Sequence, residues 1–581
     1  MKADRFLTLY ERVVDAPAAA DRLRRFVLDL AVRGKLVEQD SGDEPASALL
    51  ERIAAEKARL MRAGKLRRRR TPPRFGEPPF ALPANWRWSR IGDFASDRGQ
   101  RVPDRPFTYI DVSAIDKKAG LVADPRVLEP SEAPSRARKL ARSGDVVYSC
   151  VRPYLLNVAI IEDDYDPPPI ASTAFEVLNG HGLVLPRYTW IVLRSSFMIA
   201  CVEHCQRGQA YPAINSTDFA VLPFPLPPLA EQHRIVAKFD ELMVLCGRLD
   251  ETRAARESTR DRLTNACYAR LSATETDSAT FQSHTRFNVG ALPALTARAN
   301  QVKHLRETIL NLAVQGKLVE QDPADEPASK QLERIAEEKA KLVLAGNFRE
   351  FKAHRSADGA SFPFPIPARW IWCHLDDLAA IARGGSPRPI KAYVTDDPDG
   401  IPWIKIGDSV RDSIYINQTS ERIRPEGVTK SRLVRRGDLL LSNSMSFGFP
   451  YIMGIEGCIH DGWLVIRTPE RLVDKLFLHA LFRSGHAQRT FAKSASGAVV
   501  RNLNTEKVRL LPVPLPPLAE QHRIVAKVDE LMALCDRIEA ALAATNAARS
   551  ELVESLLHDA LQPPHSRPHW PNEHLGAGLG S

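Results

Sequence analysis

Several short motifs in this sequence combine residue types that could carry out chemistry. Asp166-Pro167-Pro168-Pro169 resembles the tetrad of an Asp or Asn, two prolines and an aromatic residue that holds the target amine in amino-methyltransferases. The aromatic residue is missing and no glycine-rich cofactor loop accompanies the motif, so we interpret it as a rigid proline turn. Pro103-Asp104 with Asp116-Lys117-Lys118 resembles a nuclease core in which two carboxylates and a lysine bind Mg²⁺. Patterns this short arise easily by chance, and we assign no nuclease site to them.

The possible metal-binding and phosphate-binding motifs are also incomplete. Cys201, His204 and Cys205 lie at i, i+3 and i+4 of a predicted helix, but zinc needs a fourth ligand to which the sequence does not point. Buried thiols beside an ordinary histidine are the simpler interpretation. Gly34-Lys35 and Gly316-Lys317 are followed by Leu, not by the Ser or Thr of a phosphate loop, and indicate helix ends. We therefore predict no catalytic residue, metal site or cofactor site in this chain.

The elements that must position any functional residue are organised by an internal repeat. The fourteen residues PLPPLAEQHRIVAK occur at 225–238 and again at 514–527. LAVRGKLVEQD at 30–40 returns as LAVQGKLVEQD at 312–322, and each is followed by DEPAS. We name the segments A, T1, B, A′, T2 and B′ in chain order, where A and A′, and B and B′, are near-copies. The predicted organisation is an N-terminal helical segment (1–80), T1 (81–224), a central helical region (225–345), T2 (346–513), a C-terminal helix (514–562) and a flexible tail (563–581).

T1 and T2 differ in sequence although the segments around them do not. They share only a frame, in which Gly144-Asp145 in T1 corresponds to Gly437-Asp438 in T2, and Leu222-Pro223 corresponds to Leu511-Pro512. A simple duplication would be expected to drift everywhere. Divergence confined to T1 and T2 suggests that they do one job on two different targets.

The repeated segments are predicted to be helical. Apolar residues of B and B′ recur at alternating steps of four and three, which is the pattern of a coiled-coil seam that includes Cys246 and Cys535. A helix over 229–270 would be roughly 60 Å long at about 1.5 Å per residue. A and A′ each predict two shorter helices, and 272–300 is predicted to be a polar linker. The simplest closure packs B′ against A, which brings the chain ends together and gives a pseudo-twofold repeat.

T1 and T2 are predicted to be mixed α/β domains. Short strands are expected at Tyr109–Val112, Val146–Ser149, Trp403–Ile406 and Leu439–Ser442. The predicted fold class is therefore α/β, with two α/β domains separated by long antiparallel coiled-coil-like helices and related by an internal pseudo-twofold repeat.

The composition is that of a folded soluble protein. The 80 Lys and Arg residues exceed the 71 Asp and Glu residues, which leaves a formal net charge of +9 that is compatible with a polyanionic partner. We find no run of about 18 apolar residues for a membrane span and no signal peptide. We therefore expect a cytoplasmic protein whose cysteines are reduced.

These features resemble the specificity (S) subunits of type I restriction–modification enzymes. The resemblance rests on the doubled PLPPLAEQHRIVAK and GKLVEQD…DEPAS segments around two dissimilar domains, and it covers about Leu23 to Leu561. Gly384-Gly385-Ser386-Pro387 and Ile401–Asp408 in T2 are similar to the opening of many target-recognition domains of that family. T1 lacks the GGSP element and starts with Tyr109–Ser113 instead, which makes the transfer of contact residues into T1 less secure.

The resemblance implies that each target-recognition domain reads one half of a bipartite, asymmetric site in double-stranded DNA. It also implies that the helices set the spacing and dock two modification (M) methyltransferase subunits. S-adenosylmethionine, ATP and Mg²⁺ would then belong to the M subunits and to motor-nuclease restriction (R) subunits, while the S subunit catalyses nothing. The alternatives are a standalone nuclease or methyltransferase, which the missing cofactor loop disfavours, and a coiled-coil scaffold without a DNA role, which the divergence of T1 and T2 disfavours.

Within the two domains, candidate DNA-reading residues were chosen because polar and basic side chains contact base edges and phosphates. The candidate residues in T1 are Tyr148, Ser149, Arg152, Tyr154, Asn157, Arg207, Gln209, Tyr211 and Asn215. Those in T2 are Lys405, Ser442, Asn443, Ser444, Arg501, Asn502 and Asn504. The loops 208–215 and 497–504 hold equivalent positions but differ in content, as expected for two readers of different sequences. A basic run at Lys65, Arg67–Arg70 and Arg74 could follow a phosphate backbone or could be an exposed linker.

Overall fold

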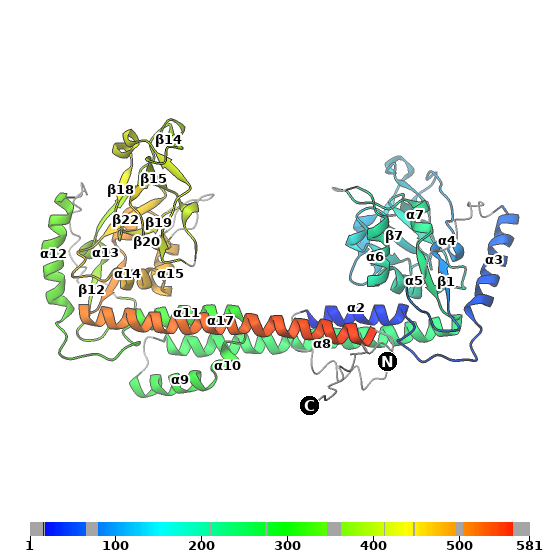
Figure 1. The fold of residues 1–581 in the computed structure, drawn as a ribbon, viewed down its shortest axis with the longest axis horizontal. Coiled ribbons are helices and arrows are strands. Elements are labelled where there is room, and N and C mark those ends of the chain that lie inside the picture. The colour runs from blue at the N-terminus through cyan, green and yellow to red at the C-terminus, as the bar shows by residue number, and fades with distance from the viewer. Residues whose placement is uncertain are drawn as a thin grey trace, which may run out of the picture. The chain divides into compact units, whose positions relative to one another are not determined.

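The computed structural model describes residues 16, 18–64, 79–208, 211–273, 277–345, 362–411, 413–444, 448–494 and 503–561 (Figure 1). The chain divides into two compact units. Unit 1 contains residues 1–255 and 546–581, and unit 2 contains residues 256–545. Each unit therefore holds one diverged domain, one copy of segment A, and parts of both long helices.

Segments A and A′ each form two helices, as predicted. In unit 1 these are α2 (Ala19–Val32) and α3 (Ala46–Arg62), and in unit 2 they are α11 (Ala299–Val314) and α12 (Ala328–Ala345). The first helix of each pair ends at a glycine with positive φ, Gly34 at 65° and Gly316 at 70°. A β-carbon on Gly34 would lie 2.4 Å from Cγ of Pro83, so both the left-handed turn and the close approach require glycine.

T1 folds into one strand pair and two sheets. The first and last strands, β1 (Arg87–Arg90) and β11 (Pro223–Leu226), pair antiparallel. One larger sheet has the order β10 (Phe175–Leu178), β7 (Val146–Ser149), β8 (Val158–Ile160), β4 (Leu121–Val122), β3 (Ile115–Asp116). The other has the order β5 (Arg126–Leu128), β2 (Phe107–Ile110), β9 (Pro169–Ser172), β6 (Ala137–Leu140). Its helices are α4 (Ile91–Phe94), α5 (Pro186–Leu193), α6 (Ser196–Cys205) and α7 (Ser216–Ala220).

T2 repeats this plan. Its first and last strands, β12 (Ile371–His374) and β23 (Pro512–Leu515), pair antiparallel. One sheet has the order β13 (Ala380–Arg383), β22 (Trp463–Arg467), β19 (Leu439–Ser442), β20 (Pro450–Met453), β16 (Tyr415–Ile416). The other has the order β14 (Val394–Thr395), β17 (Glu421–Ile423), β15 (Ile401–Ile404), β21 (Gly457–Ile459), β18 (Arg432–Val434). Its helices are α13 (Leu375–Leu378), α14 (Lys475–Arg483), α15 (Gly485–Ser494) and α16 (Thr505–Arg509).

The mixed α/β prediction is confirmed, with small shifts of strand boundaries. The strands predicted at Val146–Ser149 and Leu439–Ser442 form as β7 and β19. The strand predicted at Tyr109–Val112 forms as β2 two residues earlier, because Val112 begins a 3₁₀ turn that Asp111 caps. The strand predicted at Trp403–Ile406 likewise forms as β15 and ends before the 3₁₀ turn at Ile406–Asp408.

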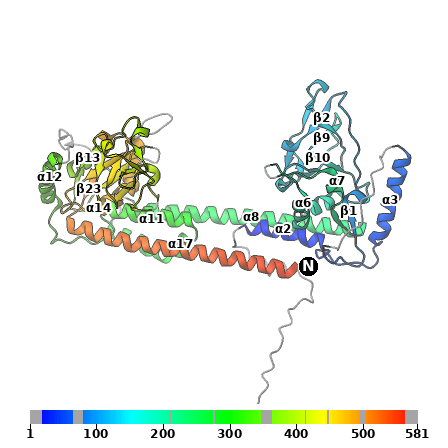
Figure 2. The same cartoon turned by 45° about the horizontal axis from the view of Figure 1, so that its top comes forward.

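The predicted long helices are α8 (Leu229–Leu271) and α17 (Leu518–Leu561). In unit 1, Leu242, Cys246 and Leu249 of α8 share one core with α2 and with Val553 and Leu557 near the end of α17. Arg22 of α2 donates a hydrogen bond of 2.9 Å to the carbonyl of Ser550 on α17, and Lys35 contacts the carbonyl of Leu561. Figure 2 shows α2 beside the end of α17. The predicted closure of B′ onto A is therefore confirmed within unit 1.

Unit 2 uses the same contacts at equivalent positions. Ile524, Val528 and Cys535 of α17 share a core with α11. Arg306 of α11 pairs with Glu539 at 2.8 Å, as Arg24 of α2 pairs with Asp250 at 2.6 Å in unit 1. The similarity of the repeated segments agrees with this packing, since arginines at equivalent positions of α2 and α11 pair with carboxylates at equivalent positions of α8 and α17.

The expectation of a polar linker at 272–300 is wrong. This stretch contains α9 (Ser278–Gly290) and α10 (Leu292–Leu295) and the start of α11. Asp277 caps α9 by accepting a hydrogen bond of 2.9 Å from the Thr280 amide. Leu295 and Phe281 pack on Cys267, Tyr268 and Leu271 of α8, contacts that the sparse apolar residues of this stretch did not reveal. Among the described helices, none is long and apolar enough to cross a membrane.

Candidate nucleic-acid interface

The two predicted clusters in each diverged domain are joined by their backbones. In T1 the amide of Ile214 donates a hydrogen bond of 3.0 Å to the carbonyl of Cys150, just after β7. In T2 the amide of Leu503 donates a hydrogen bond of 2.7 Å to the carbonyl of Asn443, just after β19. Both contacts join the segment after a sheet strand, β7 in T1 and β19 in T2, to the segment before the last described helix of the domain, α7 or α16. The structure thus brings together residues that lie about sixty positions apart in sequence.

In T1 this junction exposes aromatic and basic side chains, which we call the T1 surface (Val151, Arg152, Tyr154, Arg207 and Tyr211). Isolated β-bridges join Ala213 to both Val151 and Arg207. Tyr154 is 50% exposed and Tyr211 is 69% exposed. The Arg152 guanidinium lies 4.7 Å from the centroid of the Tyr211 ring. Stacking faces beside cations are the side-chain types that contact nucleotides.

Two predicted contact residues have a structural role that is the same in both domains. Asn215 caps α7 by accepting a hydrogen bond of 2.8 Å from the Asp218 amide. Asn504 caps α16 by accepting a hydrogen bond of 2.9 Å from the Glu506 amide. Asparagine is a preferred helix cap because its side-chain oxygen satisfies an otherwise unpaired amide. An identical residue with an identical role in both domains does not distinguish two different targets.

Five other predicted contact residues are buried: Tyr148, Ser149, Asn157, Ser442 and Asn443. Tyr148 stacks on Phe219 with ring centroids 4.7 Å apart, and burial raises the pKa of its hydroxyl. Ser149 donates a hydrogen bond of 2.9 Å to the carbonyl of Val151, and Ser442 accepts one of 3.0 Å from the Phe449 amide. In this structure these side chains shape the loops and have no surface for contact with a base.

Fewer of the predicted DNA-contact residues are exposed in T2 than in T1. Lys405 pairs with Glu421 at 2.6 Å, and Ser444 is half-buried. His460, which lies two residues before Gly462, accepts a hydrogen bond of 3.0 Å from the Ile406 amide, next to Lys405 in sequence. A β-carbon on Gly462 would come within 2.9 Å of the Ser444 hydroxyl. Burial lowers the pKa of His460, which therefore joins these loops mainly as a neutral ring.

The sequence analysis missed one basic residue of T2. The Arg411 guanidinium lies 5.2 Å from the centroid of the Phe449 ring, and Phe449 is tied to Ser442 through its amide. Arg411 is exposed, as is the neighbouring Val410. The available signal was an arginine shortly after the Ile401–Asp408 motif, but the aromatic partner lies about forty residues away in sequence. We call Lys405, Arg411, Ser444 and Phe449 the T2 surface.

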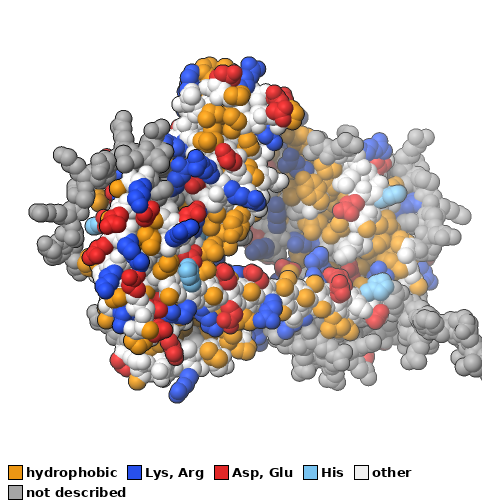
Figure 3. All heavy atoms as spheres, turned by 60° about the vertical axis from the view of Figure 1, so that its left-hand side comes forward, with side chains coloured by type: hydrophobic (Ala, Val, Ile, Leu, Met, Phe, Trp, Pro, Cys, Tyr) orange, Lys and Arg blue, Asp and Glu red, His pale blue; other side chains and the backbone are white. Residues whose placement is uncertain are grey.

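Several predicted residues lie outside the described residues. These are Gln209, Arg501 and Asn502, together with the basic run at Lys65, Arg67–Arg70 and Arg74. On the face of the molecule shown in Figure 3, basic and acidic side chains are interspersed, so recognition there would depend on particular side chains more than on a patch of one sign.

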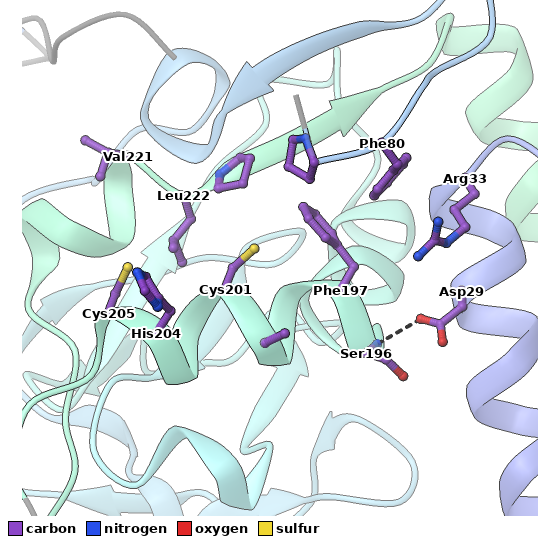
Figure 4. Close-up of a pocket in the computed structure, with 13 residues that line it drawn as sticks. Asp29, Arg33, Phe80, Ser196, Phe197, Cys201, His204, Cys205, Val221 and Leu222 are labelled. Carbon is purple, nitrogen blue, oxygen red and sulfur yellow. Dashed lines mark hydrogen bonds between the residues drawn. The ribbon is translucent and has the colours of Figure 1, made fainter. Parts of the chain in front are cut away.

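A pocket in unit 1 holds the Cys201, His204 and Cys205 motif. It has a volume of about 630 Å³ and lies between α2, α6 and the residues before β11 (Figure 4). Asp29 accepts a hydrogen bond of 2.9 Å from the Ser196 amide, and the Arg33 guanidinium lies 4.6 Å from the Phe80 ring centroid. Burial raises the pKa of the Cys201 thiol to about 11, which keeps it protonated at neutral pH. Within the part of the chain that the structure describes, no three His, Cys, Asp or Glu residues are placed to hold a metal ion.

Comparison with known proteins gives a consistent result. Residues 367–545 match the family described as the type I restriction modification DNA specificity domain. The chain is 26% identical over 573 residues to the EcoEI specificity subunit of Escherichia coli, with 93% of each chain covered. It is 26% identical over 554 residues to the Escherichia coli EcoAI specificity subunit, again with 93% of each covered.

A chain in a solved structure that addresses the assembly and conformational transition of the type I restriction–modification (R-M) system is similar to this one. The similarity has a TM-score of 0.51 at 24% identity and covers 83% of this chain and 99% of that one. A similarity at this level shows that the fold is shared.

Proposed function

We propose that this chain is a specificity subunit of a type I restriction–modification enzyme and that it recognises a bipartite DNA sequence through T1 and T2, as its similarity to such subunits supports. Each domain reads one half-site. The chain itself is the non-catalytic member of the complex. S-adenosylmethionine, ATP and Mg²⁺ are bound by the methyltransferase and motor-nuclease subunits that assemble with it.

One observation carries the assignment of the reading surfaces. The same backbone contact, Ile214 to Cys150 in T1 and Leu503 to Asn443 in T2, presents different side chains in the two domains. The T1 surface offers two arginines and two tyrosines, whereas the T2 surface offers Lys405, Arg411, Ser444 and Phe449. A shared frame with different exposed groups is what two readers of different half-sites require.

Matched exposed leucines support two equivalent sites for the methyltransferase subunits. Leu245 is 42% exposed on α8 and its copy Leu534 is 37% exposed on α17. Leu263 is 40% exposed and its copy Leu552 is 45% exposed. Unit 1 contains Leu245 and Leu552, and unit 2 contains Leu534 and Leu263. Each unit therefore presents one leucine of each kind, as docking of two identical subunits would need.

The test is methylated-site profiling with the chain and its partner methyltransferase. Replacing the T1 surface by five alanines should alter one half-site and leave the other unchanged, whereas replacing the T2 surface should do the reverse. If both replacements change the same half-site, or if neither changes base preference, the assignment is wrong. Mg²⁺-dependent cleavage by the purified chain alone would instead support the standalone nuclease.

A further inference from the structure

The two arginines of the T1 surface have different surroundings. Arg207 pairs with Asp218 at 3.1 Å, and the same carboxylate accepts a hydrogen bond of 2.9 Å from the Asn215 side chain. Arg207 therefore belongs to the ion pair beside the capped start of α7. Within the described residues, no carboxylate lies within ion-pair distance of Arg152, which is held over the Tyr211 ring instead.

The backbone at Arg152 is also unusual. Its φ is 49°, in the left-handed region that favours glycine. The Arg152 amide donates a hydrogen bond of 2.8 Å to the Pro212 carbonyl, and its own carbonyl accepts one of 3.0 Å from Leu155. These contacts use backbone atoms that any residue has, so nothing in the loop requires an arginine side chain. A side chain kept where glycine would be less strained points to a function for that side chain.

The stacked arrangement leaves the guanidinium able to bind. The guanidinium carbon lies over the Tyr211 ring, 4.7 Å from its centroid, and within the described residues no carboxylate takes up its N–H donors. Stacking also restricts the rotamers of a long side chain before it meets its target. Two parallel N–H donors match the O6 and N7 acceptors of guanine in the major groove.

We propose that Arg152, held on Tyr211, reads a guanine of the T1 half-site, and that Arg207 positions the loop without reading a base. This inference rests on the proposed function. It assigns Arg152 as the specificity-determining residue and Tyr211 as the positioning residue.

The experiment uses the full chain with its partner methyltransferase and measures methylation of duplexes in which each base pair of the T1 half-site is varied. Arg152→Gly removes the side chain and relaxes the left-handed backbone, and unchanged preference at the other positions of the site shows that the variant is folded. Preference at one G·C pair should fall by about fivefold to 150-fold, the range for loss of one bidentate contact. Arg152→Lys should reduce this preference less than Arg152→Gly does, because an ammonium can still donate to guanine O6 and N7 but lacks the planar group that Tyr211 orients.

Variants at the neighbouring positions separate reading from positioning. Tyr211→Phe keeps the ring face and should behave as the wild type, whereas Tyr211→Ala should weaken preference at the same G·C pair. Arg207→Ala should reduce the preference at that G·C pair less than Arg152→Gly does, because it removes only the ion pair with Asp218 that positions the loop. The T2 half-site is the internal control and should not change in any variant.

Each contrary outcome is distinct. If Arg152→Gly lowers methylation equally for all sequences, then Arg152 contacts phosphate and the proposal is overturned. A T1 half-site with no sensitive G·C pair, or a loss of preference in Arg207→Ala as large as in Arg152→Gly, overturns it as well. If the wild type shows no bipartite preference, the proposed function has failed and not merely the role of Arg152.

Discussion

Trp86 donates its indole N–H to the buried carboxylate of Glu231 at 2.9 Å. The same carboxylate accepts a hydrogen bond of 2.6 Å from Gln39. The three residues come from T1, B and A, so this one carboxylate joins all three segments of the first copy. Trp370 and Gln321 contact Glu520 in the same way in the second copy, at 2.9 and 2.7 Å.

Loss of the Glu231 carboxylate should therefore destabilise unit 1. Glu231→Leu leaves the buried N–H of Trp86 without an acceptor, and an unsatisfied buried donor costs about 1–3 kcal/mol. Chemical denaturation followed by circular dichroism measures the change. Glu520→Leu is the matched variant for unit 2, and Glu241→Leu at an exposed position of α8 is the control. Equal stability of Glu231→Leu and the control would contradict the role given to this contact.

His479 in α14 should make stability depend on pH. Burial lowers the pKa of its imidazole to about 4 from 6.5, so the folded chain binds a proton less readily than the unfolded chain. The contribution of the neutral ring to the free energy of unfolding is fully present above about pH 6.5. It is lost as the pH falls toward 4, which lowers the free energy of unfolding by roughly 3 kcal/mol. Thermal melts of His479→Leu should show a flatter dependence over this window. An unchanged wild-type slope in His479→Leu would refute the assignment.

The capping role of Asn504 can be separated from base reading. Asn504→Asp keeps an acceptor for the Glu506 amide and should preserve both stability and half-site preference. Asn504→Ala should destabilise α16 by about 1 kcal/mol. Chemical denaturation measures the stability of each variant, and methylated-site profiling measures its half-site preference. Loss of preference for an adenine in Asn504→Asp would show instead that this asparagine reads a base.

The exposed leucines should be needed for docking of the methyltransferase. Leu245→Ser with Leu534→Ser removes apolar surface from both units without disturbing the buried seam. We expect weaker co-purification of the partner, with an unchanged melting temperature of the isolated chain. Val410→Ser, at an exposed position of T2 next to Arg411, should retain the partner. Full co-purification with the double variant would place the docking site elsewhere.

The long helices should set the gap between half-sites. One heptad inserted at matched points of α8 and α17 preserves the seam and lengthens each helix by about 10 Å. The preferred gap should grow by about three base pairs, since one turn of about ten base pairs spans about 34–36 Å. Methylome profiling would show both half-sites unchanged. A changed half-site with an unchanged gap would contradict this role.

The sequence by itself determined the repeat, the helices and their pairing, because these depend on local periodicity and on identical segments that must make identical contacts. The seam residues Leu242, Cys246 and Leu249, the glycine stops at Gly34 and Gly316, and the closure of B′ onto A could all be read in this way. The candidate surfaces could be predicted only as regions.

Only the tertiary structure decided which of the candidate residues are exposed. Tyr148 and Ser149 lie in a strand whose two faces are both covered, so their burial depends on neighbours far away in the chain. Arg152 and Tyr211 meet because Ile214 binds the backbone of Cys150, which no local pattern encodes. For the same reason α9 escaped prediction, since its few apolar residues form a core only with α8.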